Sequence, residues 1–275
     1  LFGRNTTGGA VLLVPRKPTD TLEGFVEGSA RSYSMRRVQA VLNVPLADTF
    51  KVRLGVDRMK RDGYLNSLTN IGPSAFNDTD YLAARLSVLA ELTPDLENYT
   101  IASYSHSDTN GTVPKVIAYN PKSSFGSFAA RQINGETTAG AGWWDISNTE
   151  PDPVNKFTTW QVINTTTWQA SDTLTVKNIV SYGQFQEVAR QTLEGEYYFL
   201  PGGGAYGSAA PFLTLIRLGN FPGFRNADQQ TVTEELQLQG RTSDGKLNWQ
   251  AGGYYEQATP MGYNVQFTPF LLNCT

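Results

Sequence analysis

The sequence has very little cysteine and histidine: its 275 residues include one of each, Cys274 and His106. A structural zinc site takes about four Cys or His ligands, and a disulfide framework needs pairs of cysteines. These residues by themselves therefore exclude a Cys/His zinc site and a disulfide framework. Methionine is also scarce, with three residues.

Long apolar runs are missing as well. No run reaches the roughly 18 apolar residues of a transmembrane helix, and the mean hydropathy is −0.33. A membrane protein is still allowed, because the strands of a transmembrane barrel alternate apolar and polar residues and their hydropathy averages out.

Clusters of one charge sign are also absent. The net charge is −3 and the 22 Lys and Arg residues are scattered along the chain, so no basic patch indicates nucleic-acid binding. The chain begins at Leu1, with no charged segment followed by an apolar stretch, and no signal peptide is visible. We expect both ends to be cut from a longer chain.

The composition favours strands and turns. The chain holds 26 glycines, 13 tyrosines, 14 phenylalanines and 5 tryptophans, together with many Thr and Val residues. Segment 37–46 alternates clearly, because Val38 and Leu42 share one face while Arg37, Gln39 and Asn43 share the other. The same alternation recurs and predicts about nine strands of roughly ten residues, the others including 50–56, 82–92, 160–168, 174–182, 232–238 and 247–255.

The connections between these strands alternate in length. Four of them are tight turns, at 47–49, 93–96, 171–172 and 243–245. The intervening ones are mostly long, at about 62–78, 109–155, 189–228 and from 259 onward; the short connection at 32–34 is the exception. Loops of this length argue against a compact soluble domain. Short turns at one end and long loops at the other are typical of an outer-membrane barrel.

The first eighteen residues, LFGRNTTGGAVLLVPRKP, combine a glycine-rich turn with a short apolar strand at 10–14. No Lys-Ser or Lys-Thr pair follows the glycines, which argues against a phosphate-binding loop, although an ordinary hairpin remains an alternative. With Gly3, Arg4, Gly8 and Gly9 as its motif, the segment resembles the end of the plug domain of TonB-dependent outer-membrane receptors. Segments 23–64 and 231–257, which include TEELQL and WQAGGYY, resemble barrel strands of the same family.

The resemblance implies an all-β fold: a partial antiparallel transmembrane β-barrel, about nine strands of a larger barrel, preceded by the last strand of a plug domain. Residues 1–18 would be the C-terminal end of the plug and residues 19–275 the N-terminal part of the barrel. Side chains such as Leu54 and Leu86 would then face lipid, whereas cations such as Arg16 and Lys17 suit docking inside a polar wall.

The same resemblance implies a receptor in the bacterial outer membrane that binds and imports a scarce nutrient, with a ferric siderophore as the leading substrate and cobalamin or a glycan as others. Its partners would be outer-membrane lipid and the TonB complex, the latter through a segment missing here. No catalytic, metal-binding or cofactor-binding residues are expected, and the protein is not expected to be an enzyme. The alternative is a soluble secreted β-rich domain that binds or cleaves glycans. Charged residues opposite the apolar face, such as Arg53, Asp57 and Arg85, suit a water-filled lumen better.

Ligand contacts are expected in the two longest loops. Trp143 and Trp144 lie in one, and Tyr197 and Tyr198 lie in the other beside the glycines of segment 202–204. For Trp143 and Trp144, packing within the loop is an equally good explanation. As for Cys274, we expect a disulfide with a partner beyond Thr275, because the cell surface is oxidising.

Several motifs are set aside. The G-x-G-x-x-G spacing at Gly202, Gly204 and Gly207 is interpreted as loop flexibility, since no helix follows it. Ser105 and His106 should point to opposite faces of a strand, which argues against a catalytic triad. Six N-x-[ST] matches are attributed to chance in an Asn- and Thr-rich bacterial chain; they begin at Asn5, Asn77, Asn98, Asn110, Asn164 and Asn273.

Overall fold

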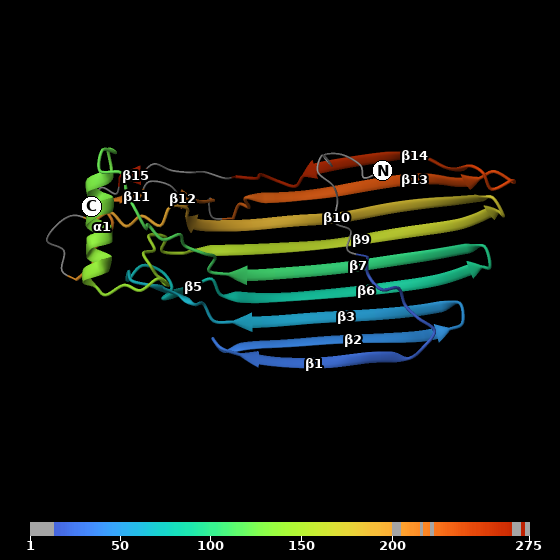
Figure 1. The fold of residues 1–275 in the computed structure, drawn as a ribbon, viewed down its shortest axis with the longest axis horizontal. Coiled ribbons are helices and arrows are strands. Elements are labelled where there is room, and N and C mark those ends of the chain that lie inside the picture. The colour runs from blue at the N-terminus through green and yellow to red at the C-terminus, as the bar shows by residue number, and fades with distance from the viewer. Residues whose placement is uncertain (1–13, 200–204, 215–216, 221–222, 266–270, 273–275) are drawn as a thin grey trace.

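The computed structural model of the chain describes residues 14–199, 205–214, 217–220, 223–265 and 271–272. Within these residues nine long strands form one antiparallel sheet, in which neighbours in sequence are neighbours in space (Figure 1). In order they are β1 (Glu23–Arg31), β2 (Met35–Ala47), β3 (Phe50–Arg61), β6 (Thr79–Thr93), β7 (Leu96–Thr109), β9 (Val154–Ser171), β10 (Leu174–Thr192), β13 (Ala227–Arg241) and β14 (Asn248–Pro260).

This sheet confirms the predicted all-β partial barrel. The tight turns lie where the sequence places them, since Ala47 ends β2 and Phe50 begins β3, and Thr93 ends β6 and Leu96 begins β7. The plug-end motif of Gly3, Arg4, Gly8 and Gly9, the strand predicted at 10–14, Gly202, Gly204 and Cys274 lie outside the described residues, apart from Val14.

Strand register separates two faces of the sheet. Leu42 lies opposite Leu54, which lies opposite Leu86, and the row continues through Ala102 and Val162. We call the side on which these residues lie the apolar face. Asn43, Arg53 and Ser87 are paired in the same way on the other side, which we call the polar face. The predicted alternation therefore matches the observed register.

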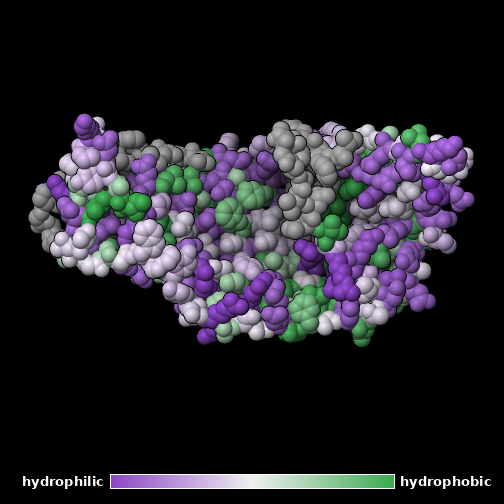
Figure 2. Space-filling model, viewed as in Figure 1, coloured by the Kyte–Doolittle hydropathy of each residue, from purple (hydrophilic) through white to green (hydrophobic). Residues whose placement is uncertain are grey.

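Figure 2 shows the molecule in the orientation of Figure 1, with large hydrophilic areas at the turn end of the sheet. Strands β9 and β10 are 18 and 19 residues long. A tilted transmembrane strand needs about 9–11 residues, so their ends on the long-loop side extend beyond what a bilayer requires. The predicted length of about ten residues was too short for these strands.

The long connections fold together at one end of the sheet. We call their described residues, within 62–78, 110–153 and 193–226, the loop head; it lies at the left of Figure 1. Its elements, with one short strand from the region after β14, are β4 (Leu65–Ser67), β5 (Ala75–Phe76), α1 (Gly126–Thr138), β8 (Asp145–Ile146), β11 (Leu213–Thr214), β12 (Arg217–Leu218) and β15 (Leu271–Leu272).

Packing rather than local propensity stabilises the loop head. Leu65, Phe76, Val113 and Ile146 form a buried cluster drawn from two of the three connections. Helix α1 begins without a side-chain cap hydrogen bond and contains interior glycine, so its own sequence is a weak helix former. The helix was not predicted from the sequence, because contacts with other loops, such as Ala129 against Tyr198, stabilise it.

A charge on the apolar face should destabilise the full-length protein. If the apolar face meets lipid as expected and Leu54 lies near the bilayer midplane, Leu54→Arg should cost about 2–4 kcal/mol of folding free energy. The measurement is a denaturant titration in lipid vesicles. Gln161→Arg, on the polar face, is the matched control and should have little effect. Equal losses for the two variants would contradict the assignment of the faces.

Candidate functional site

The segment that enters the sheet is held by one buried amide. Asn43 on β2 is 0% exposed. Its side-chain nitrogen donates to the carbonyl oxygens of Thr19 (2.9 Å) and Thr21 (2.7 Å), and its side-chain oxygen accepts from the Thr19 amide (3.0 Å). Because Asn43 lies on the polar face, the entering chain is anchored to that face at residues 19–21.

Ion pairs surround this anchor. Lys51 is 6% exposed and lies between Asp20 (2.6 Å) and Glu91 (3.0 Å). Lys17 reaches Glu97 on β7 (2.5 Å), and its ammonium group lies 5.4 Å from the centre of the Tyr99 ring. The expectation that cations of the entering segment dock on a polar wall is thus met by Lys17.

The polar face also carries ion pairs between its own strands. Arg37 donates two hydrogen bonds to the carboxylate of Asp57, at 2.9 and 2.6 Å, and Gln39 and Tyr81 donate to the same carboxylate. Such groups need partners or water to be stable away from bulk solvent. The arrangement fits the predicted wet wall better than the dry core of a soluble sandwich.

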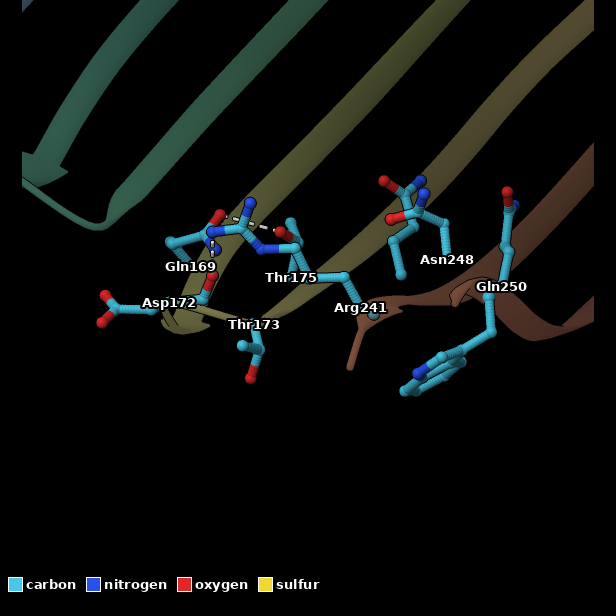
Figure 3. Close-up of a pocket in the computed structure, with 10 residues that line it drawn as sticks. Gln169, Asp172, Thr173, Thr175, Arg241, Asn248 and Gln250 are labelled. Carbon is cyan, nitrogen blue, oxygen red and sulfur yellow. Dashed lines mark hydrogen bonds between the residues drawn. The ribbon is translucent and has the colours of Figure 1, made fainter. Parts of the chain in front are cut away.

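A polar hollow lies at the turn end of the same face (Figure 3). Arg241 at the end of β13 donates to the carbonyl oxygen of Asp172 in the turn between β9 and β10 (3.1 Å). Thr175 donates to the amide oxygen of Gln169 (2.7 Å), and Gln250 lies on the same wall. Neutral amides dominate this hollow, which offers hydrogen bonds but little net charge.

The predicted tryptophan pair is displayed on an organised turn. Trp143 and Trp144 are 68% and 54% exposed. The turn is closed because the Gly142 amide donates to the carboxylate of Asp145 (2.7 Å), and Lys115 donates to the carbonyl oxygens of both Gly142 and Asp145. Asn66 on β4 donates to the same carboxylate (3.0 Å). These bonds hold the two indole rings at the surface.

Aromatic rings from two further connections extend this surface. Trp144 meets Tyr64 edge-on with 5.4 Å between ring centres, and Tyr64 lies 5.9 Å from Tyr33. The guanidinium group of Arg61 lies 5.1 Å from the centre of the Tyr64 ring. Tyr33, in the turn between β1 and β2, and Tyr64, just after β3, were not among the predicted contacts. Sequence separation concealed that these rings lie in one row, which we call the aromatic row.

The predicted tyrosine pair lies elsewhere. Tyr197 and Tyr198 are 1% and 7% exposed, inside the loop head. The Tyr197 hydroxyl donates to the carbonyl oxygen of Ala209, and the Tyr198 ring packs against Phe125 and Phe128 of the helix region. Both side chains therefore pack inside the loop head in this structure and do not face solvent.

A buried polar network joins two of the connections. Gln132 on α1 donates to Glu136 (3.0 Å) and to the carbonyl oxygen of Gly195 (2.9 Å), and it accepts from the Tyr197 amide. Glu136 also accepts from Ser147 and Tyr206. Burial raises the pKa of the Tyr206 phenol, so this hydroxyl stays protonated and able to donate.

Of the three glycines in the G-x-G-x-x-G spacing, Gly207 lies within the described residues. It allows the backbones of two connections to approach each other closely. Its φ is +86°, and a Cβ atom there would lie 1.9 Å from the Leu68 carbonyl oxygen. Its own carbonyl oxygen accepts from the Asn70 amide (3.0 Å). Gly207 thus joins the third connection to the first within the loop head, a packing role that the interpretation as flexibility had missed.

The other motifs form no reactive group. His106 pairs with Thr158 on the apolar face, whereas Ser105 lies on the polar face. Among the described residues, no three His, Cys, Asp or Glu side chains cluster closely enough to hold a metal ion. In the same part of the chain, no helix is long and apolar enough to cross a membrane.

Removing the Asn43 amide should release the entering segment. Asn43→Leu removes three hydrogen bonds to the backbone groups of Thr19 and Thr21 and should cost roughly 1–3 kcal/mol. Hydrogen exchange at residues 19–22 of the full-length protein should speed up, with the rest of the sheet unchanged. Gln250→Leu removes an exposed amide from the same face and is the control. Unchanged exchange in Asn43→Leu would exclude the anchor.

Acid should loosen the tryptophan turn. The Gly142 amide, and then Asn66, hold the pKa of Asp145 below its ordinary value of 3.8. A lowered pKa in the folded state means that the stabilisation is complete above about pH 4 and is lost as the pH falls through the folded value. Indole fluorescence should therefore change below pH 4, and Asp145→Asn should remove that step. A step of the same size in the variant would assign it to other groups.

Comparison with known proteins supports the fold. No protein-family model and no curated protein sequence matches the chain. Among solved structures it is similar to the ferric-catecholate import receptor Fiu from E. coli in its closed form, at 13% identity and a TM-score of 0.62, covering 90% of this chain and 33% of that one.

Two further solved structures are similar to the chain. The siderophore receptor PiuA from Acinetobacter baumannii matches at 14% identity and a TM-score of 0.56, over 88% of this chain and 31% of that one. FpvA from P. aeruginosa, bound to a pyoverdine and iron, matches at 10% identity and a TM-score of 0.58, over 94% of this chain and 31% of that one. The chain thus spans about a third of the length of these three receptors. The resemblance to TonB-dependent receptors inferred from its sequence is confirmed at the level of the fold, and the chain has the fold of a run of barrel strands from that family.

Proposed function

We propose that the chain is part of a TonB-dependent receptor that binds a ferric siderophore and imports it across the bacterial outer membrane, without covalent catalysis. In this proposal residues 1–18 end the plug and residues 19–275 begin the barrel. The observation that carries it is that the two faces of one sheet have opposite polarity and different contacts. Its apolar face suits lipid, its charged face binds the entering segment through Asn43 and Lys51, and the fold matches siderophore receptors.

The substrate class is supported by the chemistry of the aromatic row. Trp143 and Trp144 are both exposed, the Trp144 ring contacts Tyr64, and the Arg61 guanidinium group beside Tyr64 is cationic. Aromatic rings offer contact area at low entropic cost, and a guanidinium group attracts anionic ligands. A ferric catecholate is anionic and presents planar aromatic rings, so it matches both features. A glycan matches only the aromatic rings. Cobalamin is the other alternative substrate.

The partners follow from the same proposal. Outer-membrane lipid would cover the apolar face, and the TonB complex would act through a segment missing from this chain. The asymmetry of the two ends supports the orientation, since short turns are typical of the periplasmic side and long loops of the outside. The loop head would then face the medium from which a ligand arrives.

Changing both tryptophans should weaken ligand binding. In the full-length receptor, Trp143→Ala combined with Trp144→Ala removes two exposed rings, and we expect at least a tenfold loss of affinity for a ferric catecholate, about 1.4 kcal/mol or more. Fluorescence quenching measures the affinity, and heat-modifiable gel mobility reports barrel folding. Trp249→Ala, at the turn end, is the control.

Competition distinguishes the substrate classes. Cobalamin or an oligosaccharide that displaces the ferric catecholate would shift the substrate proposal to that class. A folded receptor whose affinity does not change in the double variant would remove the tryptophan turn from the binding site. Normal growth of a deletion strain on each ferric siderophore as sole iron source, with the receptor shown to be expressed in the parent, would contradict iron import.

A further inference from the structure

Two of the N-x-[ST] matches lie side by side in the sheet. Asn98 and Thr100 belong to β7, and Asn164 and Thr166 belong to β9. Asn98 lies opposite Thr166, and Thr100 lies opposite Asn164. Because side chains alternate along a strand, the Asn and Thr of each motif share one face. That face is the apolar one, so four polar side chains meet there; we call them the N-x-T clasp.

The clasp satisfies its own hydrogen bonds. Asn98 donates to the side-chain oxygens of Asn164 (3.1 Å) and Thr166 (2.9 Å), and Asn164 donates to those of Asn98 (2.9 Å) and Thr100 (2.7 Å). Thr100 donates to Asn98 (3.1 Å) and Thr166 donates to Asn164 (3.3 Å). A primary amide has two donor hydrogens and an oxygen that accepts twice. Both amides use all of these sites within the clasp.

Most neighbours of the clasp on the same face are apolar; the exception is Asn178 of β10, which donates to Glu234 of β13 (3.3 Å). Val88 and Ala90 of β6 lie opposite Thr100 and Asn98. The next row toward the loop head pairs Ala102 with Val162, and the next row toward the turns pairs Leu96 with Trp168. On the β10 side Asn164 faces Val180 and Thr166 faces Asn178. In lipid, a polar group without a partner costs several kcal/mol, so a closed network is stable there, whereas an open one is not.

The register between β7 and β9 needs a determinant other than its turn. The tight turns align the strands that they join, but β7 and β9 are joined by residues 110–153. A slip of two residues keeps every side chain on its own face, so the apolar pattern penalises it weakly. Such a slip would disrupt the four hydrogen bonds that cross between the two strands and place Thr100 or Asn98 against an apolar side chain.

Other polar contacts between β7 and β9 distinguish less strongly between the observed register and a slipped one. His106 meets Thr158 at 2.8 Å and Asp108 meets Lys156 at 2.6 Å, both near the loop head. Water can replace a lost partner at that end, and exposed ion pairs contribute little. Within the apolar band water is absent, so losing a partner there is costly.

We propose that the N-x-T clasp sets the register of β7 against β9 and so positions the two ends of the connection that carries α1 and the tryptophan turn. A two-residue slip would move one end by about 6.6–6.8 Å relative to the other, which would displace that turn from Tyr64. The four residues are positioning residues and do not touch ligand. The inference rests on the proposed function only in requiring a bilayer against the apolar face.

Cross-linking on the opposite face reads the register directly. In the full-length receptor carrying Cys274→Ser, the pair Ser103→Cys and Gln161→Cys reports the observed register, because these residues lie directly opposite each other. Ser103→Cys with Thr159→Cys or with Ile163→Cys reports a two-residue slip in either direction. A short bifunctional thiol reagent applied to outer membranes traps whichever register is present, and no ligand is needed.

The decisive variant removes every polar group of the clasp at once, through Asn98→Leu, Thr100→Val, Asn164→Leu and Thr166→Val. It strands no polar atom in lipid, so the barrel should assemble, but the slipped cross-links should rise at least tenfold. Thr165→Val, on the polar face of β9, is the control and should leave only the observed register. A folded fourfold variant that shows only the observed register would overturn the proposal.

If the fourfold variant does not assemble, a comparison of two single variants tests the proposal. Thr100→Val removes one donor and one acceptor from the clasp, whereas Thr100→Ser keeps both. Slipped cross-links or loss of folded receptor with Thr100→Val but not with Thr100→Ser supports the clasp. Equal behaviour of the two variants would overturn it. Because the readout is register, it is independent of whether the tryptophan double variant alters ligand affinity.

Discussion

The structure depends on the pairing of backbone groups across one continuous antiparallel ladder. In a bilayer no water is present to satisfy a free amide or carbonyl group, so each strand must find a partner along its length. From β1 to β14 the described strands do this in sequence order. Once the ladder is in place, the two-residue period of each strand divides its side chains into two sets, and the two faces can meet different solvents.

The polar face uses this division to bind part of its own chain. Asn43 has no contact with solvent, and all of its hydrogen bonds go to the backbone of residues 19–21. Lys51 and Glu97 add charges that match those of the entering segment. A wall of charged and amide side chains can hold a polypeptide through specific hydrogen bonds and remain wetted elsewhere.

The loop head turns three separate connections into one packed unit. Gln132, Glu136 and Gly207 each contact a connection other than their own, so the position of one connection depends on the others. The tryptophan turn is held in this frame by Asp145 and Lys115. A ligand that contacts the turn would therefore contact a packed unit that is joined directly to three strands, because β7 and β10 end at the loop head and β9 begins there.

The sequence by itself determined the nine strands, their tight turns and the side to which each side chain points, because a two-residue alternation is local and unambiguous over ten residues. Leu42, Leu54 and Leu86 illustrate this, and so does Lys17, whose charge signalled docking on a polar wall. Only the tertiary structure decided what fills the long connections. Helix α1 and the burial of Tyr197 depend on contacts between loops far apart in the chain, and local propensity carries no record of them. The pairing of two N-x-T motifs was hidden for the same reason: each is a chance-level pattern alone, and its meaning arises only when register sets Asn98 against Thr166.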